Sequence, residues 1–126
     1  MANFYRALGF IDENSKLEKG NYIEQVVHLE NVEVEWIKMR APDGNLIELL
    51  KYHSHPKKIN NNIKKTNELG CSHIAFTVKN LDQICNLIKQ KGGKFVNPPA
   101  ISPDGKVKVI YCYDPEGGLI ELVQEL

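Results

Sequence analysis

The sequence has no excess of charge of either sign, because its 16 lysine and arginine residues are balanced by 16 aspartate and glutamate residues. Without a net field to attract it, we expect the chain to bind neither nucleic acid nor an anionic membrane surface. It also lacks an apolar run of membrane-spanning length, and its first residues lack the hydrophobic stretch of a signal peptide. These absences predict a cytoplasmic protein.

Cysteine is scarce too. The three cysteines, Cys71, Cys85 and Cys112, are odd in number, far apart in the sequence and without a C-x-x-C spacing. This pattern is typical of reduced thiols in a cytosolic protein. We therefore expect no disulfide and no thiolate metal site.

What the sequence does contain is a repeat. The pattern Pro, acid, Gly, any residue, Leu-Ile-Glu-Leu occurs at residues 42–49 and again at residues 115–122, an offset of 73 positions (115 minus 42). Each copy places a glutamate, Glu48 or Glu121, inside an apolar strand, where an unpaired buried carboxylate is unfavourable. Because neighbouring residues of a strand point to opposite faces, both glutamates are predicted to face a solvated cup. The alternative is that they line an open groove as solvated or ion-paired acids.

The second half of the chain predicts the element order β-α-β-β-β. Residues 73–78 alternate with the period of two that is typical of a strand. Asn80 is a suitable N-cap, and apolar residues then recur at helical spacing until Gly92 ends the helix. Three further strands, separated by turns, are expected over residues 94–96, 106–113 and 119–123.

The first half repeats this order with one element absent. Residues 4–8, followed by Gly9, are predicted to be the end of a helix. Strands are expected over residues 22–29, 32–40 and 46–50. Subtracting the repeat offset from position 73 gives position 0 (73 minus 73), so no residue remains for a counterpart of the strand that begins at residue 73. The first strand of the first repeat is therefore predicted to be missing.

These elements predict an α+β fold of tandem βαβββ modules. We expect an N-terminally incomplete module over residues 1–52, a polar linker rich in lysine and asparagine over 53–70, and a second module over 71–126. A sheet that lacks its outer strand presents unpaired backbone groups, which invite a second chain. We therefore expect a homodimer in which one cup draws on two chains.

Three motifs together resemble those of one superfamily. They are Phe4-Tyr-Arg-Ala-Leu-Gly-Phe10, the strand His73-Ile-Ala-Phe-Thr-Val78, and the Pro-acid-Gly-x-x-Ile-Glu-Leu strand of each half. They are similar to motifs of the vicinal oxygen chelate superfamily, which includes glyoxalase I (lactoylglutathione lyase), methylmalonyl-CoA epimerase, extradiol dioxygenases, fosfomycin-modifying enzymes and bleomycin-binding proteins. The resemblance implies the glyoxalase-like fold and is closest to glyoxalase I. It does not specify the reaction, because one such scaffold hosts many chemistries.

The resemblance also implies a divalent metal bound by the first and last strands of each module. Carried over to this chain, the metal ligands are Glu48, His73 and Glu121, and Zn²⁺, Ni²⁺ or Co²⁺ suits them, or iron in a dioxygenase. The fourth ligand of relatives would come from the missing strand. Either three protein ligands and water hold the metal, or the site binds none.

A second set of candidate residues follows from the 73-residue offset. Trp36, Lys38 and Arg40 alternate along the strand next to Glu48, and they correspond to Val109, Tyr111 and Tyr113. If their face lines the cup, Lys38 and Arg40 are suited to hold an anionic substrate group. The alternative is an ordinary exposed sheet edge. The substrate-binding candidates are Trp36, Lys38, Arg40, Tyr111 and Tyr113.

For function, the resemblance favours a glyoxalase-I-like lyase or isomerase. The metal would bind two adjacent oxygens of a small substrate, and Glu121 would move a proton between neighbouring carbons through an enediolate. One alternative is a non-catalytic protein that sequesters a small molecule, as bleomycin-binding relatives do. A further alternative, an extradiol-type dioxygenase, requires two histidines and one carboxylate, of which only His73 and Glu121 are matched.

Overall fold

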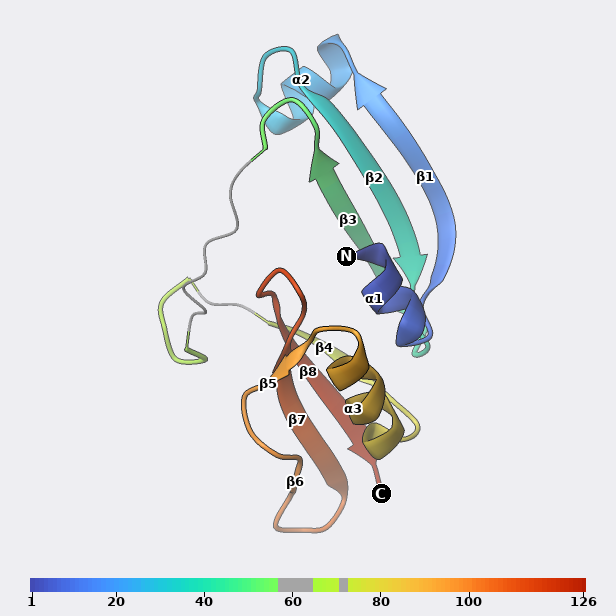
Figure 1. Cartoon of the computed structure of the whole chain (residues 1–126), viewed down its shortest axis with the longest axis vertical. Coiled ribbons are helices and arrows are strands. Elements are labelled where there is room, and N and C mark those ends of the chain that lie inside the picture. The colour runs from blue at the N-terminus through green and yellow to red at the C-terminus, as the bar shows by residue number, and fades with distance from the viewer. Residues whose placement is uncertain (57–64, 71–72) are drawn as a thin grey trace.

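The computed structural model describes residues 1–56, 65–70 and 73–126. Two β-sheets follow one another along the long axis of the molecule, with helix α1 near their junction and helix α3 beside the second sheet (Figure 1). The predicted α+β class is confirmed. Within the described ranges, no helix has the length and apolar character needed to cross a membrane.

The first half forms a three-stranded antiparallel sheet in the order β1-β2-β3, called here the first sheet. The predicted helix end before Gly9 is confirmed, and so are the two strands on either side of the Pro42-Asp-Gly turn. Gly9 follows the helix with a φ of +94°, which glycine adopts without strain. In chain order the elements are α1 (Ala2–Ala7), β1 (Ile11–Lys19), α2 (Asn21–Val27), β2 (Glu33–Arg40) and β3 (Leu46–Tyr52).

The predicted strand over residues 22–29 is wrong, because this segment is helix α2. Ile23 and Val27 are four residues apart, so a helix places them on the same side. There they pack with Val32 and Val34 in a small apolar cluster at the far end of the first sheet. These tertiary contacts favour the helical period of 3.6 residues over the strand period of two, a choice that the local sequence does not determine.

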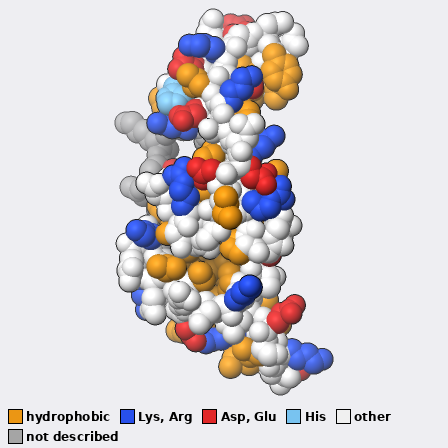
Figure 2. Space-filling model, turned by 90° about the vertical axis from the view of Figure 1, so that its right-hand side faces the viewer, with side chains coloured by type: hydrophobic (Ala, Val, Ile, Leu, Met, Phe, Trp, Pro, Cys, Tyr) orange, Lys and Arg blue, Asp and Glu red, His pale blue; other side chains and the backbone are white. Residues whose placement is uncertain are grey.

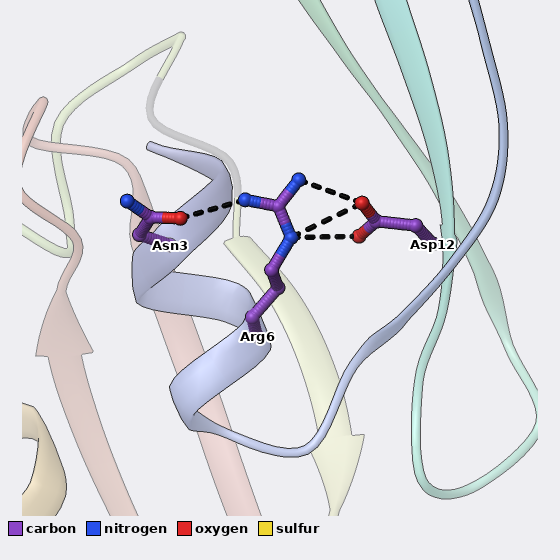
Figure 3. A network of polar contacts seen from close by, with 3 residues as sticks. All are labelled: Asn3, Arg6 and Asp12. Atoms are coloured by element: carbon purple, nitrogen blue, oxygen red, sulfur yellow. Dashed lines mark hydrogen bonds and ion pairs between the residues drawn. The ribbon is translucent and has the colours of Figure 1, made fainter.

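Strand β1 was not predicted from the sequence. Its nine residues, Ile11–Lys19, are nearly all exposed, so the segment has no apolar alternation to mark it as a strand. Backbone pairing with β2 holds it in place, and its charged side chains suit an exposed edge. Arg6 also ties α1 to this strand, donating to the Asp12 carboxylate at 2.6 Å and to Asn3 Oδ1 at 2.6 Å (Figure 3).

The second half forms the second sheet, in the order β4-β8-β7-β5, with β6 also paired to β7. The predicted β-α-β-β-β order is confirmed, with β6 as an additional short strand where turns were expected. The predicted N-cap is confirmed as well, because the Asn80 side chain accepts a hydrogen bond from the Gln83 N–H at 3.0 Å. The elements are β4 (His73–Thr77), α3 (Leu81–Gln90), β5 (Lys94–Phe95), β6 (Ala100–Ile101), β7 (Val107–Tyr113) and β8 (Leu119–Glu125).

Strands β3 and β8 carry the repeated Leu-Ile-Glu-Leu sequence and differ in their neighbours. Strand β8 lies between β7, which is antiparallel to it, and β4, which is parallel. Among the described residues, β3 is paired with β2 alone. The place that β4 takes beside β8 is therefore open beside β3, in agreement with the predicted absence of the first strand.

One hydrophobic core joins the two halves. A chain of edge-to-face aromatic contacts runs from Phe4 through Tyr5 and Phe10 to Phe76, with ring centroids 5.4, 5.1 and 5.0 Å apart. Met39 of the first sheet and Leu122 of the second belong to the same buried cluster. Strand β4 is also bound to the first half, because the Thr77 N–H donates to Asp43 Oδ2 at 3.1 Å.

Two buried thiols lie in this core. Cys85 and Cys112 are both free, and burial, with a smaller contribution from Cys85, raises the pKa of Cys112 to about 12. The Cys112 thiol is therefore protonated at neutral pH. The third cysteine, Cys71, lies outside the described residues.

The proposed linker is described only in part. Residues 53–56 and 65–70 contain no helix or strand, and residues 57–64 lie outside the described ranges. The boundaries of the two modules therefore stay a prediction.

Replacing Tyr5 by phenylalanine is expected to destabilise the contact between the halves. The Tyr5 hydroxyl on α1 donates to Asp114 Oδ2 in the β7–β8 turn at 3.2 Å, and burial raises the pKa of Tyr5 so that this proton is retained. Loss of a hydrogen bond to a charged group is expected to lower the free energy of unfolding by about 1–2 kcal/mol, measured by urea denaturation. Tyr22→Phe, at a position that is 72% exposed, is the control. Equal stability of the two variants would contradict the prediction.

Candidate functional site

Three side chains meet on one side of the second sheet. Glu121 on β8 is opposite Tyr111 on β7 and beside Ala75 on β4, and His73 lies two residues before Ala75. This register points the three side chains to the same side of the sheet. His73 Nε2 lies 3.1 Å from Glu121 Oε2. We call these residues, His73, Tyr111 and Glu121, the polar cluster.

The Tyr111 hydroxyl completes the polar cluster. It donates to Glu121 Oε2 at 3.0 Å and lies 3.4 Å from His73 Nε2. Its partial burial and then its hydrogen bond to Glu121 raise the pKa of Tyr111, so the hydroxyl keeps its proton at neutral pH.

The polar cluster is accessible to a ligand. The side chains of His73 and Glu121 are 42% and 22% exposed. An imidazole nitrogen and a carboxylate oxygen are both ligands that Zn²⁺ and related ions accept, at about 2.0–2.2 Å. Two such ligands on one ion are separated by about 3.0–3.4 Å, because the angle between them is about 90–110° for the usual geometries. The observed separation of 3.1 Å fits this range, so the pair fits two positions of a metal site.

Glu48, the third predicted metal ligand, is not brought to this pair. It lies on β3 in the first sheet, where Glu48 Oε1 is 3.9 Å from Lys38 Nζ. Across the described part of the chain, no three His, Cys, Asp or Glu side chains are grouped so as to hold a metal ion. Within its described residues, one chain therefore brings two adjacent donors together at this place.

The predicted substrate-binding residues of the first sheet lie on one face of β2. The Lys38 ammonium lies 5.2 Å from the centroid of the Trp36 ring, a cation–π distance, and also near Glu48. Arg40 is engaged elsewhere, since its guanidinium pairs with both oxygens of Glu13 and donates to the Gly44 carbonyl at 2.8 Å. Of the two cations, Lys38 is therefore the better placed to meet a ligand.

The remaining two candidates lie on β7. Tyr111 belongs to the polar cluster, whereas Tyr113 is 9% exposed and is paired with Leu119 in the sheet. The two tyrosines lie on the same side of the sheet, as strand alternation predicts. They differ in exposure, because Tyr111 is half-buried and Tyr113 is buried.

Two residues near Trp36 were missed because β1 was not predicted. Lys16 is opposite Trp36 in the pairing of β1 with β2, and its ammonium lies 2.9 Å from Glu18 Oε1. This hydrogen bond, with a smaller one from Trp36, lowers the pKa of Glu18. Charged pairs of this kind intersperse acidic and basic groups over the surface in Figure 2, so that face carries no large patch of one sign.

Comparison with known proteins shows the family to which the chain belongs. The family model described as Glyoxalase/Bleomycin resistance protein/Dioxygenase superfamily matches residues 1–122. The chain belongs to this superfamily.

Curated relatives are similar over part of their length. A probable lactoylglutathione lyase from Synechocystis is 38% identical over 55 residues, which are 44% of this chain and 42% of the relative. Lactoylglutathione lyase from Escherichia coli O157:H7 is 35% identical over 60 residues, 46% of this chain and 44% of the relative. The matched segment thus spans less than half the length of these relatives.

Solved structures agree over nearly the whole chain. A glyoxalase family protein from Bacillus cereus is similar with a TM-score of 0.86 and 26% identity, over 98% of this chain and 83% of that one. A fosfomycin resistance protein from Listeria monocytogenes has a TM-score of 0.56 and 17% identity, over 99% and 80% of the two chains. The second likeness concerns the fold alone.

Proposed function

We propose that this protein is a metal-dependent lyase or isomerase of the glyoxalase type, acting on a small substrate with two adjacent oxygen atoms. The observation that carries the proposal is the 3.1 Å separation of His73 Nε2 and Glu121 Oε2, which suits two ligands of one ion. The similarity to lactoylglutathione lyases suggests the hemithioacetal of an α-oxoaldehyde and glutathione as the substrate to test.

A bound divalent metal would act as a Lewis acid that polarises the substrate oxygens. In this proposal His73 and Glu121 hold the metal, and Glu121 also carries the proton. Its carboxylate removes the proton from the carbon that bears sulfur and returns it to the neighbouring carbonyl carbon, while the hydroxyl proton of the first carbon passes to the oxygen of the second, so the reaction is an isomerisation without a co-reactant. A carboxylate that is 22% exposed, next to the bound substrate, is suited to this role as general base.

We further propose that Glu48 of a second chain completes the site. Glu48 lies on the first sheet, and its own chain does not bring it to the polar cluster. Among the described residues, β3 pairs with β2 on one side and with no strand on the other, and such an edge favours association with another chain. In a two-fold dimer, the first sheet of each chain would face the second sheet of the other, so that two equivalent sites form.

A second candidate function is non-catalytic binding of a small molecule. It is favoured by the same fact that limits the first proposal, namely that a single chain gathers only two metal donors among its described residues. An extradiol-type dioxygenase has less support, because the described part of the chain groups no second histidine with His73 and Glu121.

Metal content is the test that separates these candidates. The proposed enzyme is expected to bind about one Ni²⁺, Co²⁺ or Zn²⁺ per chain, lose it to a chelator together with hemithioacetal turnover, and regain both when metal is restored. The measurement is elemental analysis paired with a turnover assay. Tight ligand binding that is insensitive to the chelator, with no turnover at any metal content, would instead support the binding protein.

A further inference from the structure

The Tyr111 hydroxyl occupies the junction of the polar cluster. It donates to Glu121 Oε2 at 3.0 Å, the same oxygen that lies 3.1 Å from His73 Nε2. The Tyr111 ring also meets the His73 ring edge to face, with centroids 5.2 Å apart and an interplanar angle of 76°. One side chain thus contacts both proposed metal ligands, through its hydroxyl and through its ring.

We propose that Tyr111 is a positioning residue that fixes the Glu121 carboxylate in the orientation needed to bind metal and move a proton. This inference rests on the proposed function, because it assigns a role within that site. It differs from the expectation drawn from the sequence, in which Tyr111 was a substrate-binding residue.

The argument begins with the freedom of a glutamate side chain. The terminal torsion of a glutamate is broad, so an exposed carboxylate rotates readily unless something holds it. The hydrogen bond from Tyr111 uses Oε2, and so does the contact from His73. When His73 binds metal, the Tyr111 hydroxyl is the contact that still holds Oε2, and it leaves Oε1 available for the proton transfer proposed for Glu121.

The local structure makes Tyr111 suited to this role. Tyr111 and Glu121 are directly opposite each other on antiparallel strands, and the turn that joins the strands is closed by the Asp114 N–H donating to the Gly118 carbonyl at 2.9 Å. Asp114 Oδ1 also accepts from the Gly118 N–H at 2.8 Å. The register between β7 and β8 is thus fixed close to the polar cluster. This register holds the Tyr111 hydroxyl next to the Glu121 carboxylate.

Tyr111→Phe tests the inference, because it removes the hydroxyl and keeps the ring on His73. The first readout is the dissociation constant for Co²⁺ or Ni²⁺ by titration calorimetry of the full chain, which is expected to rise about 10–100-fold. The second is the side-chain carboxylate ¹³C resonance of Glu121 in metal-free protein at one fixed pH, which is expected to shift. Tyr22→Phe, at an exposed position of α2, is the matched control and is expected to change neither.

The separate effects of Tyr111→Phe on kcat and on KM distinguish a positioning role from substrate binding. A positioning role predicts that kcat falls in Tyr111→Phe while KM stays near its original value, whereas a substrate contact made equally in the ground state predicts the reverse. Equal melting temperatures of Tyr111→Phe and the native protein would show that the loss is local.

The outcomes distinguish this inference from the proposed function. An unchanged metal affinity with an unmoved Glu121 resonance overturns the role of Tyr111, even if the native protein is an active metalloenzyme. If the native protein binds no metal, the proposed function fails at that step. The Glu121 resonance then decides the inference alone, with a shift supporting a fixed carboxylate and no shift overturning it.

Discussion

Glu121→Gln is expected to lower kcat for hemithioacetal turnover by about 10²–10⁴-fold, the range typical of losing a general base. Glutamine has the size of glutamate and can still accept a hydrogen bond from Tyr111, but its amide cannot take up a proton from carbon. The assay is run at saturating Ni²⁺ or Co²⁺ with the metal content measured, because the substitution also weakens a proposed ligand. A fall in kcat at full metal occupancy therefore reports the loss of the base.

The control for this prediction is Glu125→Gln. Glu125 lies on the same strand and on the same side as Glu121, four residues further along, and is exposed. It is expected to retain native kcat. Turnover by Glu121→Gln within a factor of a few of native, at full metal occupancy, would remove Glu121 from the role of general base.

The second half of the fold was predictable because local and tertiary signals agree there. Leu81, Cys85 and Ile88 recur at helical spacing in α3, and all three are buried in the structure. Segment 73–78 alternates as a strand does, and Phe76 on its inward side is buried. Where the hydrophobic periodicity of a segment matches its burial in the fold, its secondary structure can be predicted from the sequence.

The first half was less predictable for a physical reason. Helix α2 packs in a separate small cluster and strand β1 is an exposed edge, so burial is sparse in both and tertiary context decides the element. Ile23 is the one residue of α2 that is buried, and β1 has no buried residue. Segments that bury so little leave little hydrophobic pattern in the sequence.

The polar cluster was predictable in its parts but not in its geometry. The repeat singles out Glu121, and the 73-residue offset from Lys38 singles out Tyr111. Their contact depends on the register of β7 against β8, which the Asp114 turn determines. The corresponding turn of the first half, where the Ala41 N–H donates to the Asn45 carbonyl at 2.8 Å, places Lys38 opposite Glu48. Each repeated glutamate thus faces a polar residue of the neighbouring strand.

The relation between Glu48 and the polar cluster leads to a prediction about two chains. If Glu48 of one chain serves a site with His73 and Glu121 of another, Glu48→Gln and His73→Ala are each expected to be inactive as homodimers. A heterodimer of the two variants contains one site in which all three residues are intact and one in which both substitutions meet. When the heterodimer is purified through two different affinity tags, it is expected to show about half of the native activity per dimer.

The matched control combines His73→Ala with Glu121→Gln. Both substitutions damage the second sheet, so every site in that heterodimer lacks either His73 or Glu121, and no activity is expected to return. Recovery in the first heterodimer alone would establish that two chains share each site, because no arrangement within one chain restores both residues. Native turnover by Glu48→Gln by itself would instead show that His73 and Glu121 suffice. An inactive first heterodimer would place the three residues in one chain and require the two sheets to close on each other during turnover.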